Sequence, residues 1–268
     1  MNRLHAAPAA LTLLLALNAP AQQTETAPPA PRAPILSLAG GSSQERLRTV
    51  TILPKPGASF TATVVTEWTR NLADGTTITV KNHRFVARDS SGRTFQERRF
   101  LIPNGDTILP PLSALEYRDP TRHEFTTCDP RKRICLVSAD RYPSSIPQPT
   151  ATSGTLPGGR GAFTRESLGQ KSIEDLDATG TREIITLDAG VRGYERPEPS
   201  VKELWYSERL EVELITKSFD PRAGASTITL QNVSLSEPDQ KLFLPPEGYK
   251  IINIENDTPP PPRPTASR

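Results

Sequence analysis

The chain has 268 residues, with 32 Lys and Arg against 30 Asp and Glu, so that its formal net charge is only +2 at pH 7. Binding to nucleic acid requires a concentrated basic surface, and this balance therefore argues against a nucleic-acid partner. Proline makes up 28 residues, about twice its usual share, and gathers near both ends and in the middle of the chain.

The first 21 residues have the pattern of a secretory signal peptide. Arg3 gives a basic start, residues 6–17 are uncharged and apolar apart from Pro8 and Thr12, and small residues precede a cleavage site expected before Gln22. The apolar run is shorter than the roughly 20 residues that a membrane helix needs. We therefore expect a periplasmic or secreted protein that is not an integral membrane protein. Residues 22–44, rich in Pro and Ala, are expected to be a disordered leader.

Residues 45–255 are expected to form a single β-rich domain. Within it, residues 58–69 alternate with period two, which is typical of a half-buried antiparallel strand. Hairpin turn signals follow, and Asn82 is expected to interrupt or bulge its strand. Further strands of this meander are expected at residues 76–81, 83–89 and 93–102. Charged side chains of these strands are expected on solvated faces, namely Glu67, Arg70, Arg84, Arg88, Arg98 and Arg99.

The only two cysteines, Cys128 and Cys135, stand in the stretch CDPRKRIC. In an exported chain they are expected to form a disulfide, and Asp129-Pro130 between them predicts the turn of a β-hairpin. Two alternatives remain: a metal site that adds His123, whose spacing matches no zinc pattern, and a redox pair, which normally has the spacing C-x-x-C. At the tip, residues 131–133 form a basic knob, which is either a solvated turn or a contact for anionic lipid or a protein partner.

Beyond the cysteines, residues 142–160 are rich in Pro, Gly and Ser and are expected to be a long loop. One helical turn is expected at residues 237–242. The tail, residues 256–268, contains the run Pro259 to Pro262 and is expected to be disordered. Strands in this second half are expected at residues 163–172, 177–187, 201–206, 210–216 and 227–235.

Because no long window carries a helical stripe, the sequence predicts a mainly β fold. Many antiparallel strands must avoid exposed edges, which they do by curling or by pairing two sheets. The predicted architecture is a curled antiparallel sheet, a meander resembling a half-barrel, with a few short helices.

Several catalytic signatures are absent from the sequence. It contains neither the G-x-S-x-G elbow of serine hydrolases nor a phosphate-binding P-loop. After removal of the signal peptide only His83 and His123 remain, which argues against histidine-based acid–base chemistry and a histidine-rich metal site. The sequence predicts a protein that is not an enzyme and has no cofactor or metal.

Three stretches carry a resemblance to known proteins: EWTRNLADGTTI with RFVARDSSGRTFQE, then LGQKSIEDLDATGTRE, then KELWYSERLEVELITKSFDPRAGASTITLQNVSLSEPDQKLFLPPEGYKI. From about Leu47 to Ile251 the chain resembles a group of exported bacterial proteins of unknown function. More loosely, the chain resembles the LolA-like superfamily of periplasmic lipoprotein carriers. The similarity lies in the order of three features: a strand with Trp-Tyr-Ser, the hairpin after it and a final Phe-x-x-Pro-x-x-Tyr. That resemblance implies an antiparallel sheet curled into an open half-barrel around an apolar cavity.

Two functions follow from this resemblance and from the fold. The first is a non-catalytic envelope module that binds or carries an apolar ligand, a lipid or the acylated chain of a lipoprotein. Its ligand-binding residues would be Phe60, Val64, Trp68, Trp205, Val212 and Leu214 on the concave face. The alternative is a structural or interaction module that docks on an envelope protein through strand edges or the Pro-rich tails.

Overall fold

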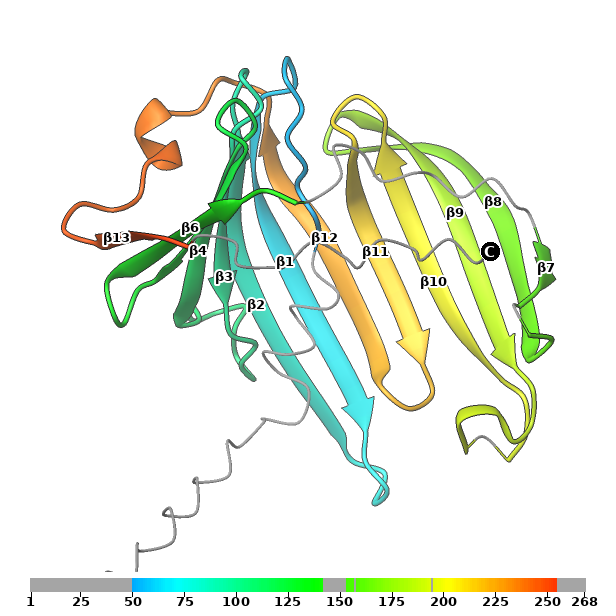
Figure 1. Ribbon diagram of the computed structural model, residues 1–268. Helices are drawn as coiled ribbons and strands as arrows, with labels where there is room; N and C mark the ends of the chain where they lie inside the picture. Colours follow the sequence, from blue (N-terminus) through cyan, green and yellow to red (C-terminus); the bar gives the residue numbers. More distant parts are fainter. Residues whose placement is uncertain (1–49, 142–152, 157, 194, 255–268) are drawn as a thin grey trace, which may run out of the picture. The chain divides into compact units, whose positions relative to one another are not determined.

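A computed structural model describes residues 50–141, 153–156, 158–193 and 195–254 (Figure 1). The predicted signal peptide, leader and tail lie outside the described residues, as does most of the predicted loop at 142–160. The described chain is dominated by strands, with two short 3-10 helices, η1 (Val191–Gly193) and η2 (Gln240–Phe243). Within this part of the chain, no helix has the length and apolar composition that crossing a membrane requires.

Six strands form the first half of the sheet. Five of them overlap the strands and the hairpin expected from the sequence, whereas β4 was not predicted. The alternating segment is one long strand, and the expected break at Asn82 is not found, since its strand is continuous. The strands are β1 (Phe60–Asn71), β2 (Thr77–Arg88), β3 (Thr94–Arg99), β4 (Leu112–Asp119), β5 (Glu124–Asp129) and β6 (Ile134–Ala139).

Seven further strands complete the sheet. Five of them overlap the strands expected from the sequence, whereas the short first and last ones were not predicted. The strands are β7 (Ser153–Thr155), β8 (Gly161–Ile173), β9 (Leu176–Leu187), β10 (Glu198–Ser207), β11 (Val212–Asp220), β12 (Gly224–Ser234) and β13 (Lys250–Asn253).

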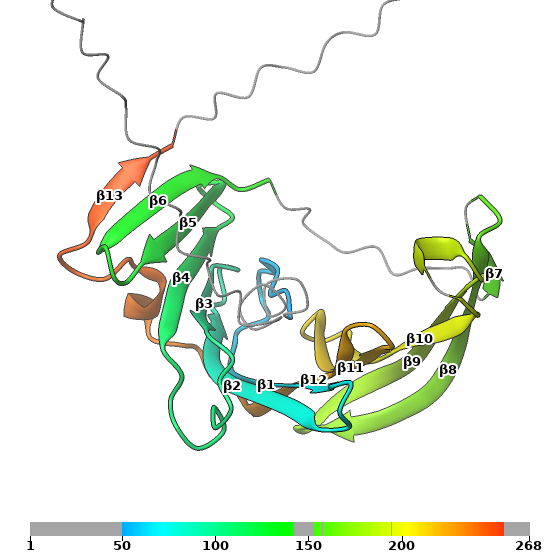
Figure 2. The same cartoon turned by 90° about the horizontal axis from the view of Figure 1, so that it is seen from below.

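All of these strands belong to one thirteen-stranded sheet in the order β13-β6-β5-β4-β3-β2-β1-β12-β11-β10-β9-β8-β7. Neighbours in the sheet are mostly neighbours in sequence, which confirms the predicted antiparallel meander. The two halves are joined where β1 pairs with β12, and β13 is the one strand described that pairs in parallel, with β6. The sheet curls without closing, because β13 and β7 remain its two edges (Figure 2).

Apolar side chains gather on both faces of the curled sheet, in different halves. On the concave face, the core lies over β1, β12, β11 and β9. On the convex face, a second core lies over β2 to β6, where η2 covers it from outside the curve (Figure 2). The two cores arise because successive residues of a strand point to opposite faces: in β2, buried Val86 belongs to the concave core and buried Ala87 to the convex one.

Candidate functional site

The concave wall is an apolar layer built mainly by strands β1, β12, β11 and β9. Phe60 and Val64 of β1 and Val212 and Leu214 of β11 are buried in one cluster, as the alternation of both strands predicts. Their neighbours in the cluster include Ala62, Val86, Leu176, Ala178, Ile228 and Leu230. Each fully buried aliphatic side chain contributes roughly 1.5–3 kcal/mol to folding, so this layer is a main source of stability.

The two tryptophans of the predicted ligand site lie at the margins of the concave wall. Trp205 of β10 is half-buried and packs against the cluster, with the Lys171 ammonium 3.8 Å from its ring centroid. An added Cβ at Gly180 would lie 2.7 Å from ring atoms of Trp205, so the ring requires glycine on the next strand. Trp68 is buried further along β1, and its Nε1 donates to the carbonyl oxygen of Ala223 at 2.9 Å.

Five of the six predicted residues therefore meet in one cluster, and Trp68 lies on the same strand at its edge. Their role in ligand binding stays a prediction. In the described chain they serve as core residues, with Phe60, Val64, Val212 and Leu214 fully buried.

A short covering segment, residues 50–53, closes the concave wall from inside the curve (Figure 2). Val50 and Ile52 are buried in the same cluster, and so is Leu210 from the β10–β11 turn. The segment has no regular secondary structure. The chain that follows is tied to the same turn by Lys55, whose ammonium lies 2.6 Å from the Glu211 carboxylate.

Arg88 joins the covering segment to the sheet. Its guanidinium is completely buried and donates to three backbone carbonyl oxygens: from Nε to Ala58 at 2.8 Å, from Nη1 to Leu53 at 3.0 Å and from Nη2 to Leu210 at 2.6 Å. Its Cζ also lies 5.0 Å from the ring centroid of Phe60. Burial lowers the pKa of Arg88 to about 10, so the group is still charged at neutral pH. One side chain thus fixes both parts of the cover.

Next to the concave wall, the inner face of β2 to β4 is polar and buried. Arg84 Nη1 donates to Gln96 Oε1 at 3.4 Å, Gln96 Nε2 donates to Glu116 Oε2 at 3.2 Å, and Arg98 Nη2 donates to the same oxygen at 2.8 Å. Two further nitrogens of Arg98 are buried without a hydrogen-bond partner. The concave face therefore changes from apolar on β1 and β11 to charged on β2 to β4.

The expectation that Arg84 and Arg88 lie in solvent is wrong, since both are buried. The side chains of Arg98 and Arg99 are 13% and 11% exposed, so these too are mostly buried. The physical reason is that both faces of this part of the sheet are covered, which leaves an alternating strand no solvated face. The register of β1 and β2 could have indicated that two of these arginines are buried. Arg88 pairs with Phe60 and Arg84 with Val64, and both partners are core residues.

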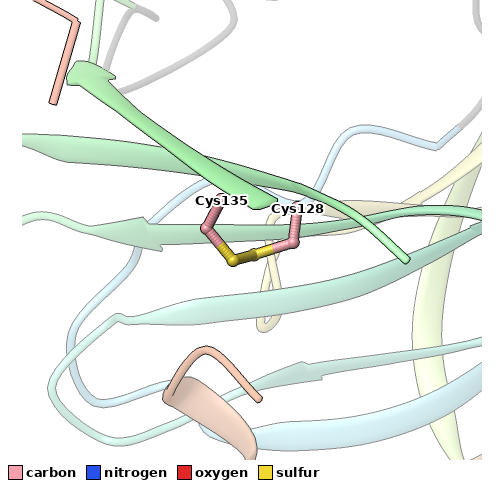
Figure 3. Close-up of a disulfide and its surroundings, with 2 residues drawn as sticks. All are labelled: Cys128 and Cys135. Carbon is pink, nitrogen blue, oxygen red and sulfur yellow. A yellow bond between two sulfur atoms is a disulfide. The ribbon is translucent and has the colours of Figure 1, made fainter. Parts of the chain in front are cut away.

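The convex core contains the disulfide between Cys128 and Cys135, which confirms the predicted bridge (Figure 3). The two cysteines pair directly across the β5–β6 hairpin and pack with Phe95, Tyr117 and Phe243. Burial raises the pKa of Tyr117 to about 12, so its hydroxyl stays protonated at neutral pH. Among the described residues, no group of three or more His, Cys, Asp and Glu side chains could hold a metal ion.

A notch lies at the far end of β1 from the covering segment. Its volume is about 640 Å³, and it is lined by Arg70, Asn71, Phe219, Pro221, Arg222 and Gly224. The β11–β12 turn beside it is held in place, because Asp220 Oδ1 accepts the backbone N–H groups of Arg222 at 2.8 Å and Ala223 at 3.2 Å. The notch thus combines guanidinium groups with the half-exposed ring of Phe219 on a fixed turn.

No model of a known protein family matches this sequence, and no curated protein matches it. The chain is similar in structure to the Pseudomonas aeruginosa MucA/MucB complex, with a TM-score of 0.38 and 10% identity over 76% of this chain and 62% of the matched one. It therefore spans less than two thirds of that matched chain. It is also similar to LprF from Mycobacterium bovis, with a TM-score of 0.26 and 11% identity over 68% of this chain and 90% of that one.

A LolA superfamily protein from Nitrosomonas europaea matches with a TM-score of 0.26 and 12% identity, covering 72% of this chain and 92% of that one.

Proposed function

We propose that this protein is a non-catalytic binding module of the cell envelope, which takes up an apolar ligand against the concave wall of its sheet. The ligand class is a lipid or the acylated chain of a lipoprotein. One observation carries the proposal: the concave wall is closed by residues 50–53 and one turn, not by a second sheet. A cover this small can move aside without unfolding the strands beneath it.

The proposed compartment is the periplasm or the outside of the cell. A predicted signal peptide precedes the domain, and the only two cysteines form a disulfide, as is usual in oxidising compartments. We propose no catalytic step. On the inner face, the mostly buried carboxylate of Glu116 accepts hydrogen bonds from both Gln96 and Arg98.

In this proposal the ligand replaces the covering segment on the concave wall. Val50 and Ile52 are buried in the same cluster as Phe60 and Val64. An acyl chain that displaces them would restore the same apolar contacts. The half-buried ring of Trp205 would mark the margin of the ligand site.

We expect lipid to bind most readily when the covering segment is weakened. Ile52→Ala removes a fully buried side chain of that segment and should lower stability by about 2–5 kcal/mol. Its melting temperature should then rise more than that of the wild type when lipid is added, because lipid refills the vacated space. Native mass spectrometry of protein purified from the envelope, together with melting curves with and without phospholipid, measures both effects.

Leu115→Ala is the matched control, since Leu115 is buried in the convex core and lies outside the concave cluster. It should lose stability without a larger response to lipid. The proposal is contradicted by wild type and Ile52→Ala proteins that carry no lipid and melt at the same temperature with and without it.

A structural or interaction module remains the second candidate, and the edge strand β13 favours it. This strand pairs with β6 on one side only, and its Ile251 side chain is half-exposed. An open edge of this kind can accept an added strand from a partner protein.

Ile251→Lys is expected to abolish docking at this edge without unfolding the sheet, because a charged edge residue blocks strand addition. Cross-linking in intact cells, followed by affinity purification of wild type, Ile251→Lys and a chain lacking residues 257–268, tests this candidate. Loss of one specific cross-linked partner in either variant supports it; cross-links that are the same in all three proteins contradict it.

A further inference from the structure

We propose that the β3–β4 loop and the β5–β6 turn together dock this protein on an anionic membrane surface. The proposal concerns the turns at one end of the strands and does not rest on ligand binding at the concave wall. It assigns a role to the basic knob of residues 131–133 and to the exposed apolar residues beside it.

The apolar part of the surface is a pair of adjacent aliphatic side chains. Ile108 and Leu109 in the β3–β4 loop are 53% and 59% exposed. The loop holds a defined shape, because the backbone N–H groups of Thr107 and Ile108 both donate to the carbonyl oxygen of Asn104, at 3.1 and 3.0 Å. Side-by-side aliphatic residues on a fixed loop are an exposed apolar patch of the kind that marks interaction surfaces.

The basic part of the surface is the β5–β6 turn. Arg131, Lys132 and Arg133 are all exposed there. The Arg131 guanidinium lies 5.7 Å from the ring centroid of Phe100, and the Phe100 N–H donates to Pro111 at the end of the apolar loop. Contact between the two segments therefore brings cations next to aliphatic side chains, which is the combination that anionic lipid surfaces bind.

The distribution of charged side chains between the two ends of the strands favours membrane contact at this end. Strands β1, β3, β5 and β11 end here, and further exposed apolar side chains lie at their turns: Leu72, Ile78 and Phe219. Exposed basic side chains outnumber acidic ones at this end, where the acidic ones are Asp74, Asp106, Asp188 and Glu195, and Asp106 is paired with Lys81. At the opposite end, acidic side chains (Glu174, Asp175, Glu208, Glu237 and Asp239) outnumber the exposed basic ones, Arg122, Arg209 and Lys241. An anionic bilayer would attract the first end and repel the second, and this charge complementarity selects a membrane over an apolar protein surface.

Co-sedimentation with lipid vesicles tests the proposal, using exported protein after purification. We expect the wild type to bind vesicles of about 30% phosphatidylglycerol in phosphatidylcholine, to bind pure phosphatidylcholine at least tenfold more weakly, and to lose binding in high salt. The double variant Ile108→Ser with Leu109→Ser should reduce binding to the anionic vesicles at least tenfold. Lys132→Gln with Arg133→Gln, which leaves the contact of Arg131 with Phe100 in place, should reduce it to a similar extent.

Leu235→Ser is the matched control, because Leu235 is 37% exposed but lies at the acidic end. It should bind vesicles like the wild type, and circular dichroism should show the same fold for all variants. Wild-type protein that stays in the supernatant with anionic vesicles would overturn the proposal. So would unchanged binding by the Ile108 and Leu109 variant, or equal binding to neutral and anionic vesicles.

Discussion

Replacing Arg88 with methionine is expected to lower the free energy of unfolding by about 3–5 kcal/mol. Methionine fills much of the arginine volume but donates no hydrogen bonds. Three backbone carbonyls, those of Leu53, Ala58 and Leu210, would lose the donor that they have in the folded protein. Each buried acceptor left without a donor costs roughly 1–3 kcal/mol, so the loss exceeds that of a typical core substitution.

Urea unfolding under oxidising conditions measures the change, with Arg122→Met as the matched control. The Arg122 side chain is 67% exposed and pairs with Glu124 at the surface, so its loss should change stability by less than about 0.5 kcal/mol. Arg88→Lys separates charge from geometry, because lysine keeps the charge but lacks the planar fork that reaches three acceptors. We expect it to be nearly as unstable as Arg88→Met. Equal midpoints for Arg88→Met and Arg122→Met would refute the role assigned to Arg88.

The same variant bears on the proposed ligand site. Arg88 holds both parts of the cover, so its loss should free residues 50–53 before it disrupts the pairing of β1 with β2. Relative to the wild type, the rate of amide hydrogen exchange should then increase more at Ile52 and Leu53 than at Val64 or Val86. A uniform increase over all these residues would instead indicate that Arg88 supports the whole sheet and that the cover does not open by itself.

Local pattern predicted most of the strands, and non-local pairing explains those it missed. The pattern at residues 58–69 predicts β1, because its apolar and polar residues alternate without interruption. β4 follows Pro110-Pro111 and alternates less clearly, and β13 is four residues long. β13 becomes a strand only because β6, more than a hundred residues earlier, supplies its hydrogen bonds. No signal within such a short segment indicates this pairing.

Asn82 illustrates the same limit within a strand. Asparagine often bonds its own backbone and interrupts regular structure, which is why a break was expected. Here its Nδ2 donates to the carbonyl oxygen of Arg99 at 2.8 Å, so the side chain is satisfied by another part of the fold and β2 runs through.

For the candidate site, alternation predicted which residues share a face but not what covers them. Phe60, Val64, Val212 and Leu214 do gather on one face, as their spacing indicates. The same alternation could not show that residues 50–53 would lie over them, because that segment has no period of its own. It also could not show that β2 is buried on both sides, since a buried arginine and a solvated one look alike until their partners are known.

Gly224 is the second position where a large effect is expected, because its backbone requires glycine for two reasons. Its φ is +90°, a conformation that costs an L-residue roughly 1–2 kcal/mol. In addition, an added Cβ would collide with the carbonyl oxygen of Thr69 on the neighbouring strand. The backbone shift that such a collision forces typically costs a further 1–3 kcal/mol. The free energy of unfolding of Gly224→Ala should therefore be lower than that of the wild type by about 3 kcal/mol in all.

Gly75→Ala separates the two causes. Gly75 has a similar φ of +82°, but an added Cβ there would meet nothing within 4 Å. It should therefore show only the conformational cost, about 1–2 kcal/mol, in the same urea unfolding experiment. The difference between the two variants measures the close approach of the β11–β12 turn to β1.

This approach also holds Trp68 in place, because its indole bonds Ala223, the residue just before Gly224. In a Trp205→Phe background, where Trp68 is the only tryptophan left, Gly224→Ala should shift the fluorescence emission to longer wavelength as the turn moves away and water reaches the ring. Gly75→Ala should leave the emission unchanged. If both variants lose the same stability and keep the same emission, the turn is not pressed against β1, and the notch beside it has no fixed wall.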